Sequence, residues 1–129
     1  MKYTVKDEGH IEATLGHGTI TISSNEKIGY RPVEMLVTSI ASCSGFVFYN
    51  ILKKQRTELT ELSIEADVER NESEANRVDK VILHFTVTGK NLNEDKLLRN
   101  LDITRKHCGM VQSVEDSINI EKKFTVINE

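Results

Sequence analysis

Two cysteines, Cys43 and Cys108, are the residues of this chain whose side chains are best suited to chemistry. They lie far apart in the sequence and form no Cys-x-x-Cys motif, so their spacing alone does not indicate a metal or redox pair. Two distant cysteines in a cytosolic protein are usually unrelated small hydrophobic residues of the core. The residues around each cysteine must therefore decide whether either one reacts.

The surroundings of the two thiols differ. Cys43 has a serine on each side and then Gly45, so small residues leave room beside its sulfur. Cys108 follows His107 at the predicted start of a helix, where free amide groups and the helix dipole favour a thiolate. The thiolate is the nucleophilic form of cysteine. These local arguments favour Cys108 as the more acidic of the two thiols.

The histidines do not suggest a metal site. None of the four has the spacing of a helical or hairpin metal pair, so we predict no metal: His10, His17, His84 and His107. His107 could lower the pKa of the neighbouring thiol or join a zinc site built from distant residues. A surface histidine is the commoner outcome.

The elements that must position these side chains can be read along the chain. Residues 2–7, 10–15 and 19–23 are short runs rich in β-branched residues and separated by glycines, which predicts an antiparallel meander. Pro32 suits a first helical position, and Glu34 suits the first turn of the same helix. A long helix is predicted from residue 32 to about residue 55.

The middle of that helix has no charged side chain from Met35 to Leu52, a length at which a membrane span has to be considered. Its polar content argues against lipid, because these hydrogen-bonding groups would suit a lone span poorly: Thr38, Ser39, Ser42, Ser44, Tyr49 and Asn50. We predict a central helix buried in a core or a dimer interface. Phe46, Phe48 and Tyr49 should pack in the core, or alternatively form the walls of an apolar pocket.

The second half of the chain predicts a hairpin, two helices and a final strand. Residues 62–69 alternate apolar and polar, and residues 78–88 form a second strand after the polar connection 71–76. Asn93 is a predicted N-cap of a helix to about residue 106. A short helix from 108 or 109 to 117 and a strand over 118–127 follow. The order predicts an α+β fold in one domain, residues 1–129.

Composition narrows the functional classes. The chain has 129 residues, of which 38% are hydrophobic and 29% charged, as in a folded globular protein. Its net charge is −3 and its basic residues are scattered among acids, which argues against a nucleic-acid partner. The first residues are charged and lack the apolar run of a signal peptide. We therefore expect a cytoplasmic protein that is not bound to a membrane.

Both cysteine segments resemble motifs of a known family. RPVEMLVTSIASC is similar to its first motif, in which a Pro, a Glu and a bulky apolar pair precede a helical cysteine that follows small residues. KHCGMVQSV is similar to its second motif, a cysteine that opens a helix late in the chain. Together with the element order β-β-β-α-β-β-α-α-β, these motifs resemble the OsmC/Ohr family of thiol peroxidases. The resemblance implies an intertwined homodimer with the long helices at its centre and active sites at the interface.

The resemblance also implies roles for the cysteines. Cys43 on the long helix would attack an organic hydroperoxide, or hydrogen peroxide, and Cys108 would resolve the resulting sulfenic acid to a disulfide. An external thiol would then reduce the disulfide, and no metal or organic cofactor is needed. The local argument favours Cys108 as the acidic thiol. We follow the resemblance, because an Arg or a desolvated interface can activate a thiol in mid-helix.

This chain departs from the peroxidase subgroup at two positions. The Glu of that subgroup follows Pro directly, whereas here Val33 intervenes, so that Glu34 points about 100° further round the helix. The subgroup also places an Arg in the N-terminal strands, whereas residues 1–30 contain none and Arg31 is the nearest substitute. Arg31 and Glu34 are therefore candidate catalytic residues whose alternative roles are a solvated loop residue and a helix-start acid.

Two function hypotheses remain from the sequence. The first is a thiol-dependent hydroperoxide reductase that uses Cys43 and Cys108 in oxidative stress defence. The second is a non-enzymatic dimer of the same fold that binds an apolar or thiol-reactive small molecule at its interface. Retention of both cysteines favours the first, and the missing N-terminal Arg favours the second.

Overall fold

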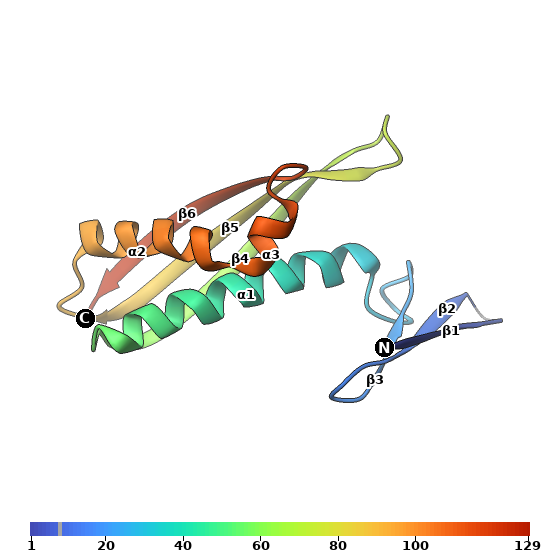
Figure 1. Cartoon of the computed structure of the whole chain (residues 1–129), viewed down its shortest axis with the longest axis horizontal. Coiled ribbons are helices and arrows are strands. Elements are labelled where there is room, and N and C mark those ends of the chain that lie inside the picture. Colours follow the sequence, from blue (N-terminus) through green and yellow to red (C-terminus); the bar gives the residue numbers. More distant parts are fainter. Residues whose placement is uncertain (8) are drawn as a thin grey trace. The chain divides into compact units, whose positions relative to one another are not determined.

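The computed structural model describes residues 1–7 and 9–129. These residues form two compact units, Met1–Thr38 and Ser39–Glu129 (Figure 1). The elements, in chain order, are β1 (Lys2–Lys6), β2 (His10–Thr14), β3 (Thr19–Ile22), α1 (Pro32–Lys54), β4 (Glu58–Asn71), β5 (Arg77–Lys90), α2 (Glu94–His107), α3 (Gly109–Val114) and β6 (Asn119–Asn128). The predicted α+β class and element order are confirmed.

The N-terminal unit contains an antiparallel sheet with the strand order β1-β2-β3. Its register pairs Val5 with Ile11 and Ile11 with Ile22. The turn between β2 and β3 is closed by a hydrogen bond from the Leu15 amide to the Gly18 carbonyl oxygen at 2.9 Å. The meander expected from the glycine-separated runs is therefore present.

The C-terminal unit contains a second sheet with the order β4-β5-β6, in which β5 is the central strand. β5 is antiparallel to β4 and parallel to β6. A parallel pair needs a crossover connection, which α2 and α3 supply here. Every second residue of β5 is buried, so one face of this sheet forms the core: Val81, Leu83, Phe85 and Val87.

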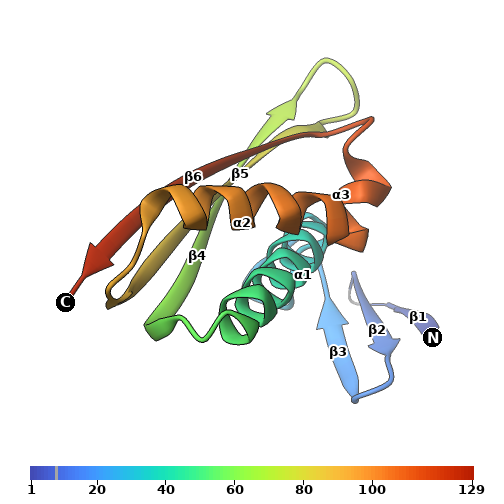
Figure 2. The same cartoon turned by 60° about the vertical axis from the view of Figure 1, so that its left-hand side comes forward.

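Helix α1 packs one stripe of side chains against that core. Pro32 is its first residue, as predicted. Within the C-terminal unit the buried residues of α1 recur every fourth position and so share one face: Ile40, Ser44, Phe48 and Leu52. The Phe48 ring meets Phe85 of β5 edge to face, with centroids 5.5 Å apart and planes at 79°. Figure 2 shows α1 and α2 on the same side of the β4-β5-β6 sheet.

The opposite face of α1 is more open than the sequence predicted. Phe48 is fully buried as expected, but Phe46 is 69% exposed and Tyr49 is 44% exposed, so the prediction that they pack in the core of the chain is wrong. Positions 46 and 49 lie on other faces of the helix from the stripe that contains Phe48. By length and composition α1 could also cross a membrane, a property it shares with core helices of soluble proteins.

Helix α2 is capped by a side chain at its N-terminus and is bonded to strand β6. Asn93 caps its N-terminus by accepting a hydrogen bond from the Lys96 amide at 3.0 Å, which confirms the predicted N-cap. The Lys122 ammonium on β6 donates to the Leu101 carbonyl oxygen at 2.9 Å. Burial lowers the pKa of Lys122, and the nearby Asp102 carboxylate opposes that effect. These contacts hold α2 on the sheet.

Several element boundaries differ from the predicted ones. Strands β4 and β5 are longer than 62–69 and 78–88, because their polar ends continue the antiparallel ladder from Glu58 opposite Lys90 to Asn71 opposite Arg77. The connection over residues 72–76 lies at the predicted hairpin turn. Helix α3 ends at Val114 instead of residue 117, and β6 is shifted by one residue at each end.

Gly89 allows a close approach of β5 to β4. A methyl group at this position would overlap the Glu58 carbonyl oxygen, a backbone atom that cannot move without disturbing the ladder. We predict that Gly89→Ala lowers the free energy of unfolding by about 2 kcal/mol or more, the cost of overpacking at a rigid contact. Urea denaturation followed by circular dichroism would measure it.

Gly18→Ala is the matched control, because a methyl group there meets no atom within 4 Å. We expect its effect to stay within about 0.5 kcal/mol. Equal stability of the two variants would contradict the proposed close approach.

Candidate functional site

The two cysteines meet where α1 passes the junction between α2 and α3. Cys43 lies on α1 next to Ser44 of the buried stripe, and its side chain remains partly accessible. Cys108 is fully buried and separates α2 from α3. Both thiols are free. In this arrangement the partly accessible Cys43 can contact a molecule from solvent, and the buried Cys108 can then react with Cys43.

The backbone at Cys108 is what creates the amide donors of this site. Cys108 is extended, with φ −83° and ψ 105°, so α2 stops and α3 starts afresh at Gly109. The first amides of a helix lack carbonyl partners within it. Here the amides of Met110 and Gly109 hydrogen-bond to the sulfur of Cys43.

These donors change the acidity of Cys43. Its pKa is lowered from the usual value, chiefly by the hydrogen bond from the Met110 amide. Burial works in the opposite direction. Hydrogen bonds from the Cys108 side chain and the Gly109 amide add to the lowering. The site therefore favours the thiolate form of Cys43, the nucleophilic form.

This result corrects one expectation from the sequence. We expected the amides at the start of the short helix to stabilise a thiolate at Cys108, because Cys108 directly precedes them. They hydrogen-bond instead to Cys43, which arrives from α1. The local argument identified the right donors and assigned them to the wrong sulfur.

Ser44 forms the other polar contact of Cys108. The Ser44 hydroxyl oxygen lies 3.4 Å from the Cys108 sulfur, and both side chains are buried. No simple reading of the sequence singled out Ser44 as more than a small neighbour of Cys43. The signal available was its place among Ile40, Phe48 and Leu52 on one helical face, where a buried hydroxyl needs a partner.

Arg31 and Glu34 form a second pair, which belongs to the N-terminal unit. The Arg31 Nε atom donates to Glu34 Oε1 at 2.9 Å, and the Arg31 amide donates to the same oxygen at 3.3 Å. This side-chain hydrogen bond lowers the pKa of Glu34, and it raises the pKa of Arg31 above its usual value. The carboxylate and guanidinium are thus kept ionised together.

The same contacts also cap α1. A Glu at the third helical position that accepts from the amide preceding the helix is half of a capping box. Arg31 further approaches Glu26, with 4.0 Å between Nη2 and Oε2. Both members of the Arg31–Glu34 pair are more than 40% exposed. The structure thus brings Arg31 to Glu34 and Cys43 to Cys108, as two separate pairs.

Among residues 1–7 and 9–129, no three or more His, Cys, Asp or Glu side chains are grouped as metal ligands. His84 donates to or accepts from the Thr125 hydroxyl at 2.8 Å on the sheet. His10 has a buried Nδ1 atom without a hydrogen-bond partner in the described chain.

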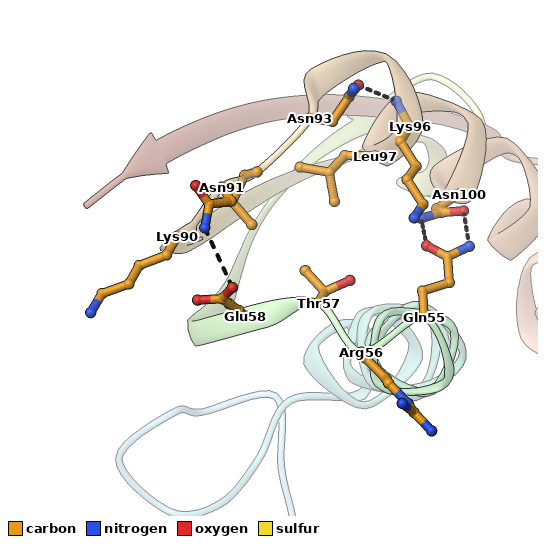
Figure 3. A pocket seen from close by; sticks show the side chains of 11 residues that line it. Gln55, Arg56, Thr57, Glu58, Lys90, Asn91, Asn93, Lys96, Leu97 and Asn100 are labelled. Atoms are coloured by element: carbon orange, nitrogen blue, oxygen red, sulfur yellow. Dashed lines mark hydrogen bonds between the residues drawn. The ribbon is translucent and has the colours of Figure 1, made fainter.

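A cavity of about 310 Å³ lies elsewhere in the C-terminal unit, beside the start of α2 (Figure 3). On its wall Gln55 donates to Asn100 at 3.0 Å and Asn100 donates back at 2.8 Å. The Arg56 and Lys90 side chains extend away from the cavity in this view. The buried Asn100 amide is thus satisfied within the protein, and the pair joins the end of α1 to α2.

The lowered pKa of Cys43 gives a direct prediction. The pH at which its alkylation by iodoacetamide reaches half of the maximal rate should be lower in the folded protein than for the same cysteine in the unfolded protein, because the hydrogen bonds stabilise the thiolate. Cys108→Ala should move this midpoint upward by removing a donor, whereas Cys108→Ser, which keeps a hydroxyl donor, should move it less. Peptide mass spectrometry would follow Cys43 alone. A midpoint in the folded wild-type protein that is no lower than in the unfolded protein would contradict the arrangement.

Comparison with known proteins identifies the family of this fold. The family model described as OsmC-like protein matches residues 23–123. Protein YhfA of Escherichia coli is 26% identical over 117 residues, covering 90% of this chain and 87% of its own.

Solved structures extend the match to nearly the whole chain. A hypothetical protein from Aquifex aeolicus superposes with a TM-score of 0.88 at 25% identity, covering 99% of this chain and 95% of its own. An organic hydroperoxide resistance protein from Legionella pneumophila has a TM-score of 0.72 at 17% identity, covering 98% and 93%. Because the family model spans most of the chain, including both cysteines, the chain belongs to the OsmC-like protein family.

Proposed function

We propose that this protein is a thiol-dependent peroxidase that reduces organic hydroperoxides, and also hydrogen peroxide, through Cys43 and Cys108 in the cytoplasm as part of oxidative stress defence. The observation that carries the proposal is the set of hydrogen bonds on Cys43. A sulfur whose pKa is lowered by hydrogen bonds, beside a second free thiol, is suited to reducing peroxides. The OsmC-like family, and the hydroperoxide resistance protein of Legionella pneumophila that shares this fold, support the same chemistry.

The proposed reaction has three steps. The Cys43 thiolate attacks the peroxide, which leaves Cys43 as a sulfenic acid and releases an alkoxide that takes up a proton to become the alcohol. The Cys108 sulfur then attacks the Cys43 sulfur, the S–O bond breaks, and the proton of the Cys108 thiol leaves with the hydroxyl group as water. An external dithiol reduces the Cys43–Cys108 disulfide and restores both thiols.

The backbone amides explain how this chain can work without an arginine in residues 1–30. Amide hydrogen bonds stabilise an anionic sulfur as the guanidinium of an arginine would, although they carry no full charge. The proposal gives Arg31, held by Glu34, an assisting role toward the thiolate or the developing alkoxide in the active protein. Their exposure is also what two residues that cap α1 would show.

We propose that the protein acts as a homodimer in which the open face of α1 is covered. Phe46 and Tyr49 are exposed on a helix whose middle carries no charge. A large exposed aromatic side chain on such a helix is typical of an interface. The expected dimer would bury these two rings at its centre.

A second candidate function is a non-enzymatic dimer that binds an apolar or thiol-reactive small molecule. It is favoured by the engagement of Arg31 with Glu34 and Glu26, which leaves its guanidinium occupied. Stoichiometric capture of a ligand without turnover would support it over the peroxidase.

The peroxidase proposal predicts steady consumption of cumene hydroperoxide with a dithiol reductant, measured against hydrogen peroxide as an alternative substrate. Cys43→Ser should abolish consumption, because the attacking sulfur is gone. Cys108→Ser should consume one equivalent and then depend on direct reduction of the sulfenic acid. Oxidised wild-type protein should contain a Cys43–Cys108 disulfide by mass spectrometry. Consumption that survives Cys43→Ser would exclude the mechanism.

Two further variants in the same assay test the second pair. Arg31→Ala should lower kcat/KM by at least about tenfold if the guanidinium assists the chemistry, and Arg31→Lys should recover only part of the loss. Arg77→Ala is the matched control, since Arg77 is an arginine at the start of β5 that is paired with Asp79. Unchanged kinetics in Arg31→Ala would leave Arg31 and Glu34 as capping residues.

The dimer proposal predicts that Phe46→Glu shifts the protein toward monomer in sedimentation velocity, because a buried charge opposes association. Leu98→Glu is a matched control, since Leu98 is 48% exposed on α2. A wild-type protein that sediments as a monomer at micromolar concentration would refute the proposal.

A further inference from the structure

We propose that Ser44 is a positioning residue for Cys108, holding its sulfur ready for the step that converts the Cys43 sulfenic acid to the disulfide. This inference rests on the proposed function and assigns a residue to its second step. It predicts that the Ser44 hydroxyl has no direct part in the attack of Cys43 on the peroxide.

The position of Ser44 on α1 is unusual for a hydroxyl. Its helical face is otherwise formed by Ile40, Phe48 and Leu52, all fully buried, and Ser44 itself is 3% exposed. A hydroxyl removed from water costs free energy unless it is hydrogen-bonded. The partner that it meets here is the sulfur of Cys108, at 3.4 Å.

The contacts form a short chain through three side chains. The Cys108 thiol hydrogen-bonds to Cys43, and the Ser44 hydroxyl can donate to the Cys108 sulfur. The two residues on α1 are adjacent in sequence, so their side chains reach Cys108 from neighbouring positions on the same helix. Cys108 is thus oriented by contacts with both.

The chemistry of resolution explains what a donor at this position would do. As the Cys108 sulfur attacks Cys43, it is oxidised and the sulfenic sulfur is reduced, while the Cys108 proton leaves with the hydroxyl group as water. Negative charge builds up on Cys108 when that proton moves. A hydrogen bond from the Ser44 hydroxyl stabilises this charge and keeps the sulfur directed at Cys43, and Ser44 loses no proton.

Serine could also be present only because it is small, allowing α1 to lie close to Cys108. Alanine satisfies that requirement equally well, so Ser44→Ala separates the two roles. It removes the hydroxyl and leaves the helix and the packing volume nearly unchanged.

The experiment is a single-turnover reaction of reduced protein with cumene hydroperoxide, in which trapping by dimedone measures the sulfenic acid and mass spectrometry measures the disulfide. In Ser44→Ala we expect sulfenic acid formation within about twofold of wild type and disulfide formation about tenfold slower, the effect of one lost hydrogen bond. Sulfenic acid should therefore accumulate, and excess peroxide should oxidise it further. Ser63→Ala, on an exposed position of β4, should change neither rate.

The outcomes are distinct. Disulfide formation within twofold of wild type in Ser44→Ala overturns the positioning role, and equal slowing of both steps overturns it as well, because that result indicates a general disturbance of the site. In either case normal turnover by wild type leaves the peroxidase proposal standing. If wild-type protein forms no sulfenic acid, the proposed function and this inference fail together, whereas a rapid first step with slow resolution in Ser44→Ala supports both.

Discussion

The extended backbone of Cys108 determines the chemistry available in this molecule. If α2 continued without a break, the amides of Gly109 and Met110 would bond to carbonyl groups one turn earlier in the helix. With φ −83° and ψ 105°, Cys108 ends one helix and starts another, which leaves these amides directed at Cys43. Cys108 thus supplies the second thiol of the site. Its extended backbone also frees the amides that stabilise the thiolate form of Cys43.

The position of Cys43 follows from the packing of α1. Ser44 lies in the stripe that α1 buries against the sheet, and one helical step of about 100° carries Cys43 to the margin of that stripe. Its sulfur therefore remains accessible while it contacts the buried Cys108. The stripe is fixed by large side chains, above all by the contact of Phe48 with Phe85 of the central strand. Packing in the core thus brings Cys43 next to Cys108.

Much of the fold could be predicted because its signals are local. The glycine-separated strands, Pro32 and the Asn93 cap each express a preference of a few neighbouring residues, and the structure contains all of them. The parallel pairing of β6 with β5, and the exposure of Phe46 and Tyr49, depend on which surfaces meet in three dimensions. A sequence pattern shows that a helix is apolar on most sides, but it does not show which side the same chain covers.

In the site, too, some features could be predicted from the sequence and others depend on contacts formed in three dimensions. Family resemblance paired Cys43 with Cys108, but the main donors to Cys43 are backbone amides, which almost every residue has and no sequence motif reveals.

A hydrogen bond to a charged group contributes roughly 1.5–3 kcal/mol where water is excluded and less where water enters. Two amides and a thiol can together exceed the burial cost of a partly accessible thiolate, in agreement with the lowered pKa of Cys43. The hydrogen bonds that lower the pKa of Cys43 come from Met110, Cys108 and Gly109 of the C-terminal unit, so the proposed mechanism does not require an arginine from the N-terminal strands to form the thiolate. In the proposed mechanism Arg31 is then left to act on the charge that develops on the departing alkoxide, a task for which a full positive charge is better suited than an amide.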